Sequence, residues 1–275
     1  MSVGAALALV AVVAADSATA VVAGVAGGIG TDATAVGSAL APLQGDAVDD
    51  WAFVLRNMDY LLGGTLVTIG LTVASILLGF LVGFPAGAVE VYGDGPLKRL
   101  VSGIGVVLRG TPIVVILVVI YFVVGVPQVN LGVYTISSAV MAGILGLGFR
   151  SAAYQSQIFR ASLASVDDGQ LEAGRAIGLS QFEAVRHIVV PQALRRSIPG
   201  FQNEFTIVLK DTSIVFAIGL AELLTRGYDL FAEQTTAVLE VILVISAIYF
   251  ALTFATNRAL DYLGDRYAIP EGEAA

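Results

Sequence analysis

YLLGGTLVTIGLTVASILLGFLVGFPAGAV (Tyr60–Val89) is a run of thirty residues without a charged side chain. A hydrocarbon core about 30 Å thick needs about 20 helical residues, so this stretch predicts a membrane-spanning helix with a turn or two to spare. Gly79, Gly83 and Gly87 recur at every fourth position. Their spacing predicts that one face of the helix packs closely against another helix, although a lipid-facing helix with incidental glycines is the alternative.

The composition extends this prediction to the whole chain of 275 residues. Hydrophobic residues make up 57% of it and charged residues 13%. Four more apolar stretches follow the first one, at 113–126, 133–159, 205–224 and 237–256. Apolar cylinders of this kind are typical of membrane proteins, whereas helices of soluble proteins carry apolar stripes. We therefore expect an all-α integral membrane protein with five spans.

The segment that follows the first span has a different pattern. Apolar residues recur between Leu97 and Leu108 at the i, i+3, i+4, i+7 spacing of an amphipathic helix, which predicts a helix lying along the membrane interface. Thr111 and Pro112 then interrupt the helix, since proline lacks a donor and clashes with the preceding turn. Because the run after Pro112 is short for a span, we expect the Arg109–Pro112 break to lie at or just within membrane depth.

Several functional classes are excluded by composition. The chain has no Cys and one His, so neither a disulfide nor a structural metal site is expected. A net charge of −8 argues against a nucleic-acid partner. The phosphate-binding pattern G-x-x-x-x-G-K-[ST] does not occur, so ATP is not bound in a P-loop of this chain. We expect no catalytic residues and no cofactor, and any energy must come from a partner.

The first 59 residues are interpreted as an N-terminal hydrophobic segment and an extracellular linker. Residues 5–29 are apolar but lack a basic region, so an extra helix is favoured over a cleaved signal peptide. Residues 31–59 are interpreted as the linker, with Trp51 and Phe53 as interfacial anchors.

A polar island, DDGQLEAGRAIGLSQFEAVRHIVVP (167–191), separates the third and fourth spans. Ser180 and Glu183 have the spacing of a capping box, so a helix is expected to begin at Ser180. Gly178 suits the left-handed conformation that ends the helix before it. Asp167 or Asp168 can cap the N-terminus of that first helix. We expect Pro191 to end the second helix. The island is thus predicted to be a helical hairpin.

Such a hairpin presents small residues between charges, which favours docking by another protein. A solvated loop is the plain alternative, and a DNA-reading helix-turn-helix fits neither the charge nor the membrane setting. His187 is interpreted as a surface contact. If the island is cytoplasmic, nine Arg and Lys residues lie inside and two outside, which agrees with the positive-inside rule.

The island resembles the EAA loop of permease subunits of ABC importers. The family pattern is EAA, three residues, Gly, nine residues, Ile, any residue, Leu-Pro, and its spacing matches here throughout. Gly174 replaces the third Ala and Val190 replaces Leu. The resemblance assigns contact with an ATPase to Glu172, Ala173, Gly174, Arg175, Gly178, Ile188 and Pro191.

Further motifs look like the polar amino acid subfamily of these permeases. They are RGTP at 109–112, PQALRRSIPGFQNEF at 191–205 and LKDTS at 209–213. The resemblance implies a five-helix permease core, here 60–257 with a coupling loop at 160–200, and a cytoplasmic tail at 258–275. It also implies two ABC ATPase subunits, a second permease that is the same chain or a homologue, and an extracellular solute-binding protein that delivers an amino acid. A secondary transporter or channel working without an ATPase is the alternative.

A substrate pathway is expected where charges and hydroxyls enter the membrane. Lys210 and Asp211 with Thr212 and Ser213 supply partners for both ends of a zwitterion, but adjacent helical residues point about 100° apart, so each charge can instead bind a neighbouring helix. Arg109, beside Thr111 at the helix break, is a second candidate for a carboxylate, with a snorkelling interfacial arginine as its alternative.

Overall fold

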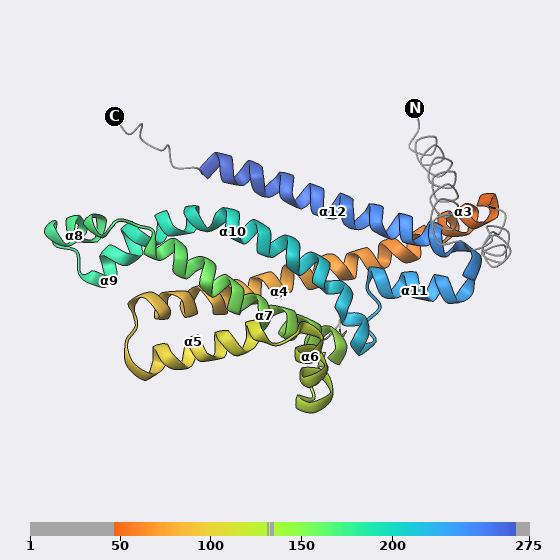
Figure 1. Ribbon diagram of the computed structural model, residues 1–275, viewed down its shortest axis with the longest axis horizontal. Helices are drawn as coiled ribbons and strands as arrows, with labels where there is room; N and C mark the ends of the chain where they lie inside the picture. Colours follow the sequence, from red (N-terminus) through yellow and green to blue (C-terminus); the bar gives the residue numbers. More distant parts are fainter. Residues whose placement is uncertain (1–46, 131, 133–134, 268–275) are drawn as a thin grey trace, which may run out of the picture. The chain divides into compact units, whose positions relative to one another are not determined.

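The computed structural model describes residues 47–130, 132 and 135–267. The predicted helix at 5–29 lies outside these residues. By their internal contacts the described residues form two units, one of residues 47–56 with Leu230–Val241 and one of Asn57–Asp229 with residues 242–267. The described residues are almost entirely helical (Figure 1), which confirms the predicted all-α class.

The larger unit is built on two long helices that lie side by side. Helix α4 spans Met58–Tyr92 and contains the whole uncharged stretch, and α7 spans Ser138–Ala164. A Cβ atom at Gly79 would come 2.3 Å from the Gln155 amide nitrogen, and one at Gly87 would come 2.7 Å from the Ser156 carbonyl oxygen. The predicted close packing of the glycine face is confirmed, and its partner is α7.

The amphipathic segment and the helix break are also confirmed. Helix α5 spans Gly95–Gly110, α6 spans Ile113–Val118, and the π-helical segment η2 continues through Val119–Val124. The axis bends by 107° between α5 and the segment after it, where Thr111 is extended and Pro112 caps α6. Beyond η2, the strands β1 (Val129–Asn130) and β2 (Thr135–Ile136) form a short antiparallel ladder.

The polar island forms the predicted hairpin, with one difference at its end. Helix α8 spans Asp168–Ala176 and α9 spans Gln181–Ala184, and the π-helical segment η3 (Val185–Val189) leads directly into α10, Val190–Asp211. The prediction that Pro191 ends a helix was therefore wrong. Pro191 occupies the first turn of α10, directly after the π-helical segment η3, and the helical backbone continues past it.

The predicted span at 205–224 is also broken. The 3₁₀ segment η4 covers Thr212–Ile218, and Gly219 follows with a left-handed φ of 73°. Thr212 and Ser213 turn their hydroxyls back onto the Leu209 and Lys210 carbonyl oxygens, which stabilises this tighter turn at the end of α10. The backbone then enters α11, Leu223–Glu233.

The last elements are η5 (Thr235–Ala237) and α12 (Val238–Tyr267), so the final helix runs past the predicted 237–256. In the smaller unit, residues interpreted as linker form helix α3, Ala47–Arg56. Its acidic first turn and basic last turn complement the helix dipole, a signal that the linker interpretation ignored. Within this unit Thr236 donates a 2.7 Å hydrogen bond to Asp50.

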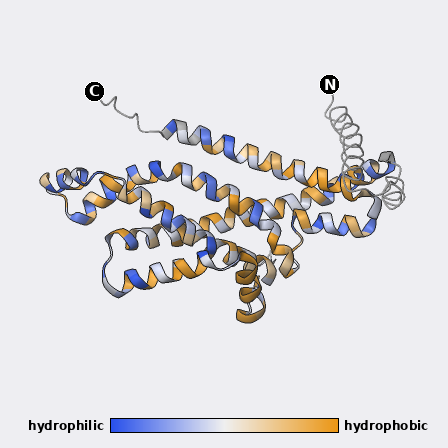
Figure 2. Cartoon of the chain, in the orientation of Figure 1, coloured by the Kyte–Doolittle hydropathy of each residue, from blue (hydrophilic) through white to orange (hydrophobic). Residues whose placement is uncertain are grey.

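Two helices of the described chain are long and apolar enough to cross a membrane, Met58–Tyr92 and Thr235–Tyr262, and the bent pair Gly95–Gly110 and Ile113–Val124 can make a third crossing. Apolar residues dominate α6, whereas polar residues gather on α8 and α9 (Figure 2). An apolar core joins α4, α6, α7 and η4 around the buried residues Leu71, Leu117, Leu147 and Val215. The five predicted spans correspond to α4, α6 with η2, α7, the end of α10 with η4, and α12.

Candidate functional site

The hairpin of α8 and α9, residues 167–190, is stabilised by hydrogen bonds at the ends of its helices and by a glycine turn. The Asp167 carboxylate accepts a 2.8 Å hydrogen bond from the Gly169 amide and caps α8. The Glu183 carboxylate accepts a 2.9 Å bond from the Ser180 amide, and the Ser180 hydroxyl accepts one from the Glu183 amide. Gly178 has a φ of 96°, which glycine adopts without strain. The predicted caps, capping box and glycine turn are confirmed.

The hairpin is anchored to the bundle by a small apolar cluster. Leu163 and Val166 at the end of α7 pack with Val189 and Ala193 at the start of α10, and Val91 of α4 packs against them. Burial of apolar groups stabilises by about 25 cal/mol per Å², so this cluster fixes the base of the hairpin while its tip stays in solvent. A rigid base is what a projecting contact surface requires.

The predicted coupling residues at the tip of the hairpin fall into an exposed set and a buried set. Glu172, Ala173 and Arg175 are exposed, whereas Gly174 is buried. A Cβ atom at Gly174 would lie 2.7 Å from Ile188 Cδ1, so Ile188 belongs to the inner side of the hairpin. Glu172 and Arg175 have no hydrogen bond or ion pair within the described part of the chain, and both charges are therefore available to a partner.

Sequence reasoning overlooked two apolar side chains of this surface. Ile177 is 79% exposed and Phe182 is 71% exposed, one on each side of the Gly178 turn. Exposed apolar groups rimmed by charges are typical of protein contact sites. The available signal was the presence of Ile and Phe inside an otherwise polar island. His187 is exposed and its Nδ1 lies 2.9 Å from the Glu183 carbonyl oxygen.

Hydrogen bonding lowers the pKa of the exposed Glu183 carboxyl below its ordinary 4.5, chiefly through the Ser180 side chain and then through the Ser180 amide. Both bonds are made to the ionised form, which they favour over the neutral one. The capping box of the hairpin is therefore a charged cap at neutral pH.

The second group of predicted residues lies where α10 ends. The Asp211 carboxylate is held by Arg150 of α7 at 2.5 Å, while Lys210 is exposed and has no side-chain partner among the described residues. Arg150 was missing from the predicted set, because its partner lies 61 residues away and nothing local connects them. The sequence marked Arg150 only as a charged residue within an apolar stretch. The hydroxyls of Thr212 and Ser213 bond to their own helix.

Arg109 and Thr111 occupy the helix break as predicted and are tied to backbone oxygens. Arg109 Nη1 donates a 2.8 Å hydrogen bond to the Ala153 carbonyl oxygen of α7, and Thr111 Oγ1 donates one of 2.8 Å to Val107. Among the described residues no hydrogen bond or ion pair joins Arg109 to Asp211, so the predicted substrate residues form two separate groups. In the described residues, no cluster of His, Cys, Asp or Glu could hold a metal ion.

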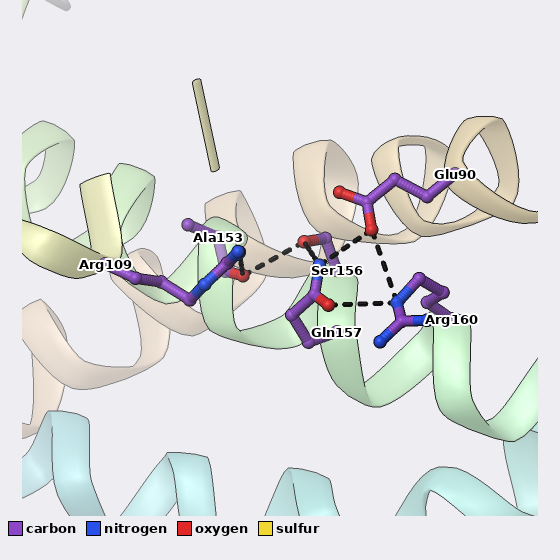
Figure 3. Close-up of polar contacts among 6 residues, drawn as sticks. All are labelled: Glu90, Arg109, Ala153, Ser156, Gln157 and Arg160. Carbon is purple, nitrogen blue, oxygen red and sulfur yellow. Dashed lines mark hydrogen bonds and ion pairs between the residues drawn. The ribbon is translucent and has the colours of Figure 1, made fainter. Parts of the chain in front are cut away.

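A third polar group joins α4 to α7 (Figure 3). The Glu90 carboxylate of α4 accepts a 2.7 Å hydrogen bond from Gln157 and lies 3.4 Å from Arg160. Gln157 in turn accepts a 2.9 Å bond from the Arg160 guanidinium. No sequence pattern singled out Glu90, which sits at the end of the uncharged stretch.

A bundle of long apolar helices with a projecting capped hairpin suits a membrane transport protein. Residues 52–269 match the family described as the inner membrane component of binding-protein-dependent transport systems. The chain belongs to this family, which supports the importer interpretation over a secondary transporter.

Relatives and solved structures agree with this assignment. The probable amino-acid permease protein YxeN of Bacillus subtilis (strain 168) is 33% identical, covering 74% of this chain and 89% of its own length. The glutamine transport system permease protein GlnP of Escherichia coli (strain K12) is 31% identical, with coverages of 80% and 98%. The crystal structure of an amino acid ABC transporter with histidines is 32% identical, covers 78% of this chain and 96% of that one, and superposes with a TM-score of 0.67.

Proposed function

We propose that the chain is the permease subunit of an ATP-driven importer, and that the hairpin 167–190 is the part that contacts a separate ATPase. The observation that carries the proposal is the hairpin itself. Its base is fixed by the cluster around Val166 and Val189, and its tip exposes two unpaired charges beside two apolar side chains. Charges that fix register around apolar anchors are what a protein groove recognises.

The substrate class proposed is a polar amino acid. Support comes from the YxeN and GlnP relatives and from the charges at the end of α10. A zwitterion needs a cation for its carboxylate and an anion for its ammonium group. Lys210 is an exposed cation one residue from Asp211, and the Arg150–Asp211 pair can exchange partners with an incoming ligand. Charges at membrane depth usually line a wet pathway, which is the role proposed for this group.

The proposed partners follow from the family. They are two ATPase subunits, a second permease that is this chain or a homologue, and an extracellular solute-binding protein. The proposed location is the plasma membrane, with the hairpin and the C-terminus in the cytoplasm. The distribution of nine Arg and Lys residues against two supports this orientation.

The test uses right-side-out membrane vesicles that carry the full transporter, with inside-out vesicles as the control. It measures the uptake of radiolabelled L-glutamine and of a mixture of radiolabelled amino acids. In Glu172→Lys, ATP-driven uptake is expected to be lost while the ATPase no longer co-purifies. Asp94→Lys is the matched control, because it makes the same charge reversal at an exposed carboxylate outside the hairpin and should leave both unchanged. ATP-independent uptake by the wild type, with no ATPase recovered, would instead establish a secondary transporter.

A further inference from the structure

We propose that the hollow between α4, α5 and α7 binds the phosphate headgroup of an anionic phospholipid. This basic hollow has a volume of about 780 Å³ and lies at the hairpin end of the bundle. The residues that give it its chemistry are Lys98, Arg99, Ser102, Arg160, Glu90 and Gln157.

Charge distinguishes this hollow from the rest of the molecule. Three cations face one carboxylate, although the chain as a whole carries a net charge of −8. Arg160 lies 3.4 Å from Glu90 and its side chain remains 49% exposed. Lys98 and Arg99 have no ion pair or hydrogen bond among the described residues. The hollow thus holds two uncompensated cations at the start of α5, which favours a ligand with negative charge.

The surroundings of Glu90 set a second requirement for the ligand, which is a hydrogen-bond donor. Its side chain is 6% exposed, and one carboxylate oxygen is occupied by Gln157 and Arg160, as Figure 3 shows. The other oxygen, Oε1, is buried without a hydrogen-bond partner in the described structure. A buried acceptor left unpaired is costly, so a ligand that carries a donor beside its phosphate fits better than a bare phosphate. The glycerol hydroxyls of phosphatidylglycerol are donors of this kind.

An apolar groove continues from the basic hollow along α5. It has a volume of about 470 Å³ and is lined by Leu100, Ile104, Val107 and Leu108, while Arg99 and Gly103 line both spaces. Leu100 is 60% and Val107 65% exposed. A charged hollow that opens into an apolar groove has the two-part shape of a phospholipid, whereas a soluble anion would leave the groove unused. Basic pockets between membrane helices on the cytoplasmic side are suited to such headgroups.

Gly103 allows the groove to be tested without disturbing the fold. A Cβ atom at this position meets nothing within 4 Å, so Gly103→Leu places a side chain where the two spaces join. Gly70→Leu on α4 is the matched control, since a Cβ atom there also meets nothing within 4 Å. Lys98→Gln with Arg99→Gln removes the unpaired cations, and Arg258→Gln with Arg266→Gln removes two exposed cations from α12.

The experiment purifies each full-length variant from vesicles of equal parts phosphatidylglycerol and phosphatidylethanolamine and counts retained lipids by native mass spectrometry. The wild type and both controls should retain phosphatidylglycerol preferentially. Loss of two charge-assisted contacts should lower that retention about tenfold or more, and Gly103→Leu should lower it comparably.

Three outcomes would overturn the proposal. Equal retention of both lipids by the wild type would remove the anionic preference. Unchanged retention in Gly103→Leu, combined with displacement of the lipid by inorganic phosphate, would reduce the hollow to a site for soluble anions. Loss of the bound lipid whenever a second copy of the chain co-purifies would show that a protein covers this face.

Discussion

Gly83 of α4 and Ala152 of α7 are in contact without an intervening side chain: a Cβ atom at position 83 would lie 2.7 Å from the Ala152 carbonyl oxygen. Real Cβ atoms do not approach a backbone oxygen this closely, so a substitution must push the two helices apart. The contact lies between Gly79, which faces the side chains of Ser151 and Gln155, and Gly87, which faces the Ser156 carbonyl oxygen. The glycine face of α4 is thus packed closely against α7.

Gly83→Ala is expected to destabilise the protein by about 1–3 kcal/mol, the usual cost of overpacking. Gly70→Ala on the same helix is its control, because a Cβ atom at Gly70 meets nothing within 4 Å and alanine favours the helix by about 0.5–1 kcal/mol. Thermal unfolding of both variants in the same detergent measures the difference. Equal melting temperatures would contradict the close contact.

Gly174 and Gly178 of the hairpin should respond to alanine by different amounts. Gly178→Ala forces a Cβ atom onto a residue with a φ of 96° and should cost about 1–2 kcal/mol. In Gly174→Ala the new Cβ atom meets the flexible end of Ile188 at 2.7 Å and the Ala184 Cβ atom at 3.2 Å. The gain in helix propensity offsets part of this crowding, so the variant should cost less than Gly178→Ala. Amide hydrogen exchange of residues 168–189 reports local opening. Faster exchange in Gly174→Ala than in Gly178→Ala would be the contrary result.

Removing one member of the Arg150–Asp211 pair should cost more than removing both. Arg150→Leu leaves a carboxylate without its partner and should destabilise by about 1–3 kcal/mol. Arg150→Leu combined with Asp211→Leu should recover most of that loss, since an apolar pair of similar size replaces the ion pair. A double-mutant cycle on thermal unfolding in detergent measures the coupling. Additive losses would mean that the two charges do not interact.

The hairpin should lose stability in acid through Glu183. Its pKa is lower in the folded hairpin than in the open one, so the open form binds more protons as the pH falls below about 4.5. The stabilisation of the folded hairpin by the ionised Glu183 carboxylate is fully present above pH 4.5. It is lost as the pH falls through the lowered pKa of the folded form. Protection of the Ser180 amide, corrected for intrinsic exchange, should fall between pH 6 and pH 3.5 in the wild type. Glu183→Gln should show no such fall.

Features that depend on neighbouring residues were predictable from the sequence. The cap of α8 by Asp167 and the box between Ser180 and Glu183 involve partners within three residues, so the sequence order alone identifies them. The uncharged run at 60–89 likewise specifies its helix, because length and hydropathy decide it.

Features that depend on the tertiary fold were not predictable. The Arg150–Asp211 pair joins residues 61 positions apart, and Glu90 and Arg160 meet only because α4 and α7 lie side by side. Pro191 was misassigned because proline both ends helices and begins them, and the choice depends on the π-helical turn before it. The break at Gly219 interrupts a hydropathy pattern that reads as continuous.

The two sides of the hairpin are joined to the bundle in different ways. Residues 165–167 interrupt the helix between α7 and α8, whereas η3 joins the hairpin to α10 without a loop. Helix α10 has 22 residues and is therefore about 33 Å long. We expect a displacement of the hairpin to be carried along α10 to Asp211, because η3 leaves no loop in which the motion could be absorbed. Spin labels at the two ends of α10 should then move together, and a displacement confined to the hairpin end would contradict this expectation.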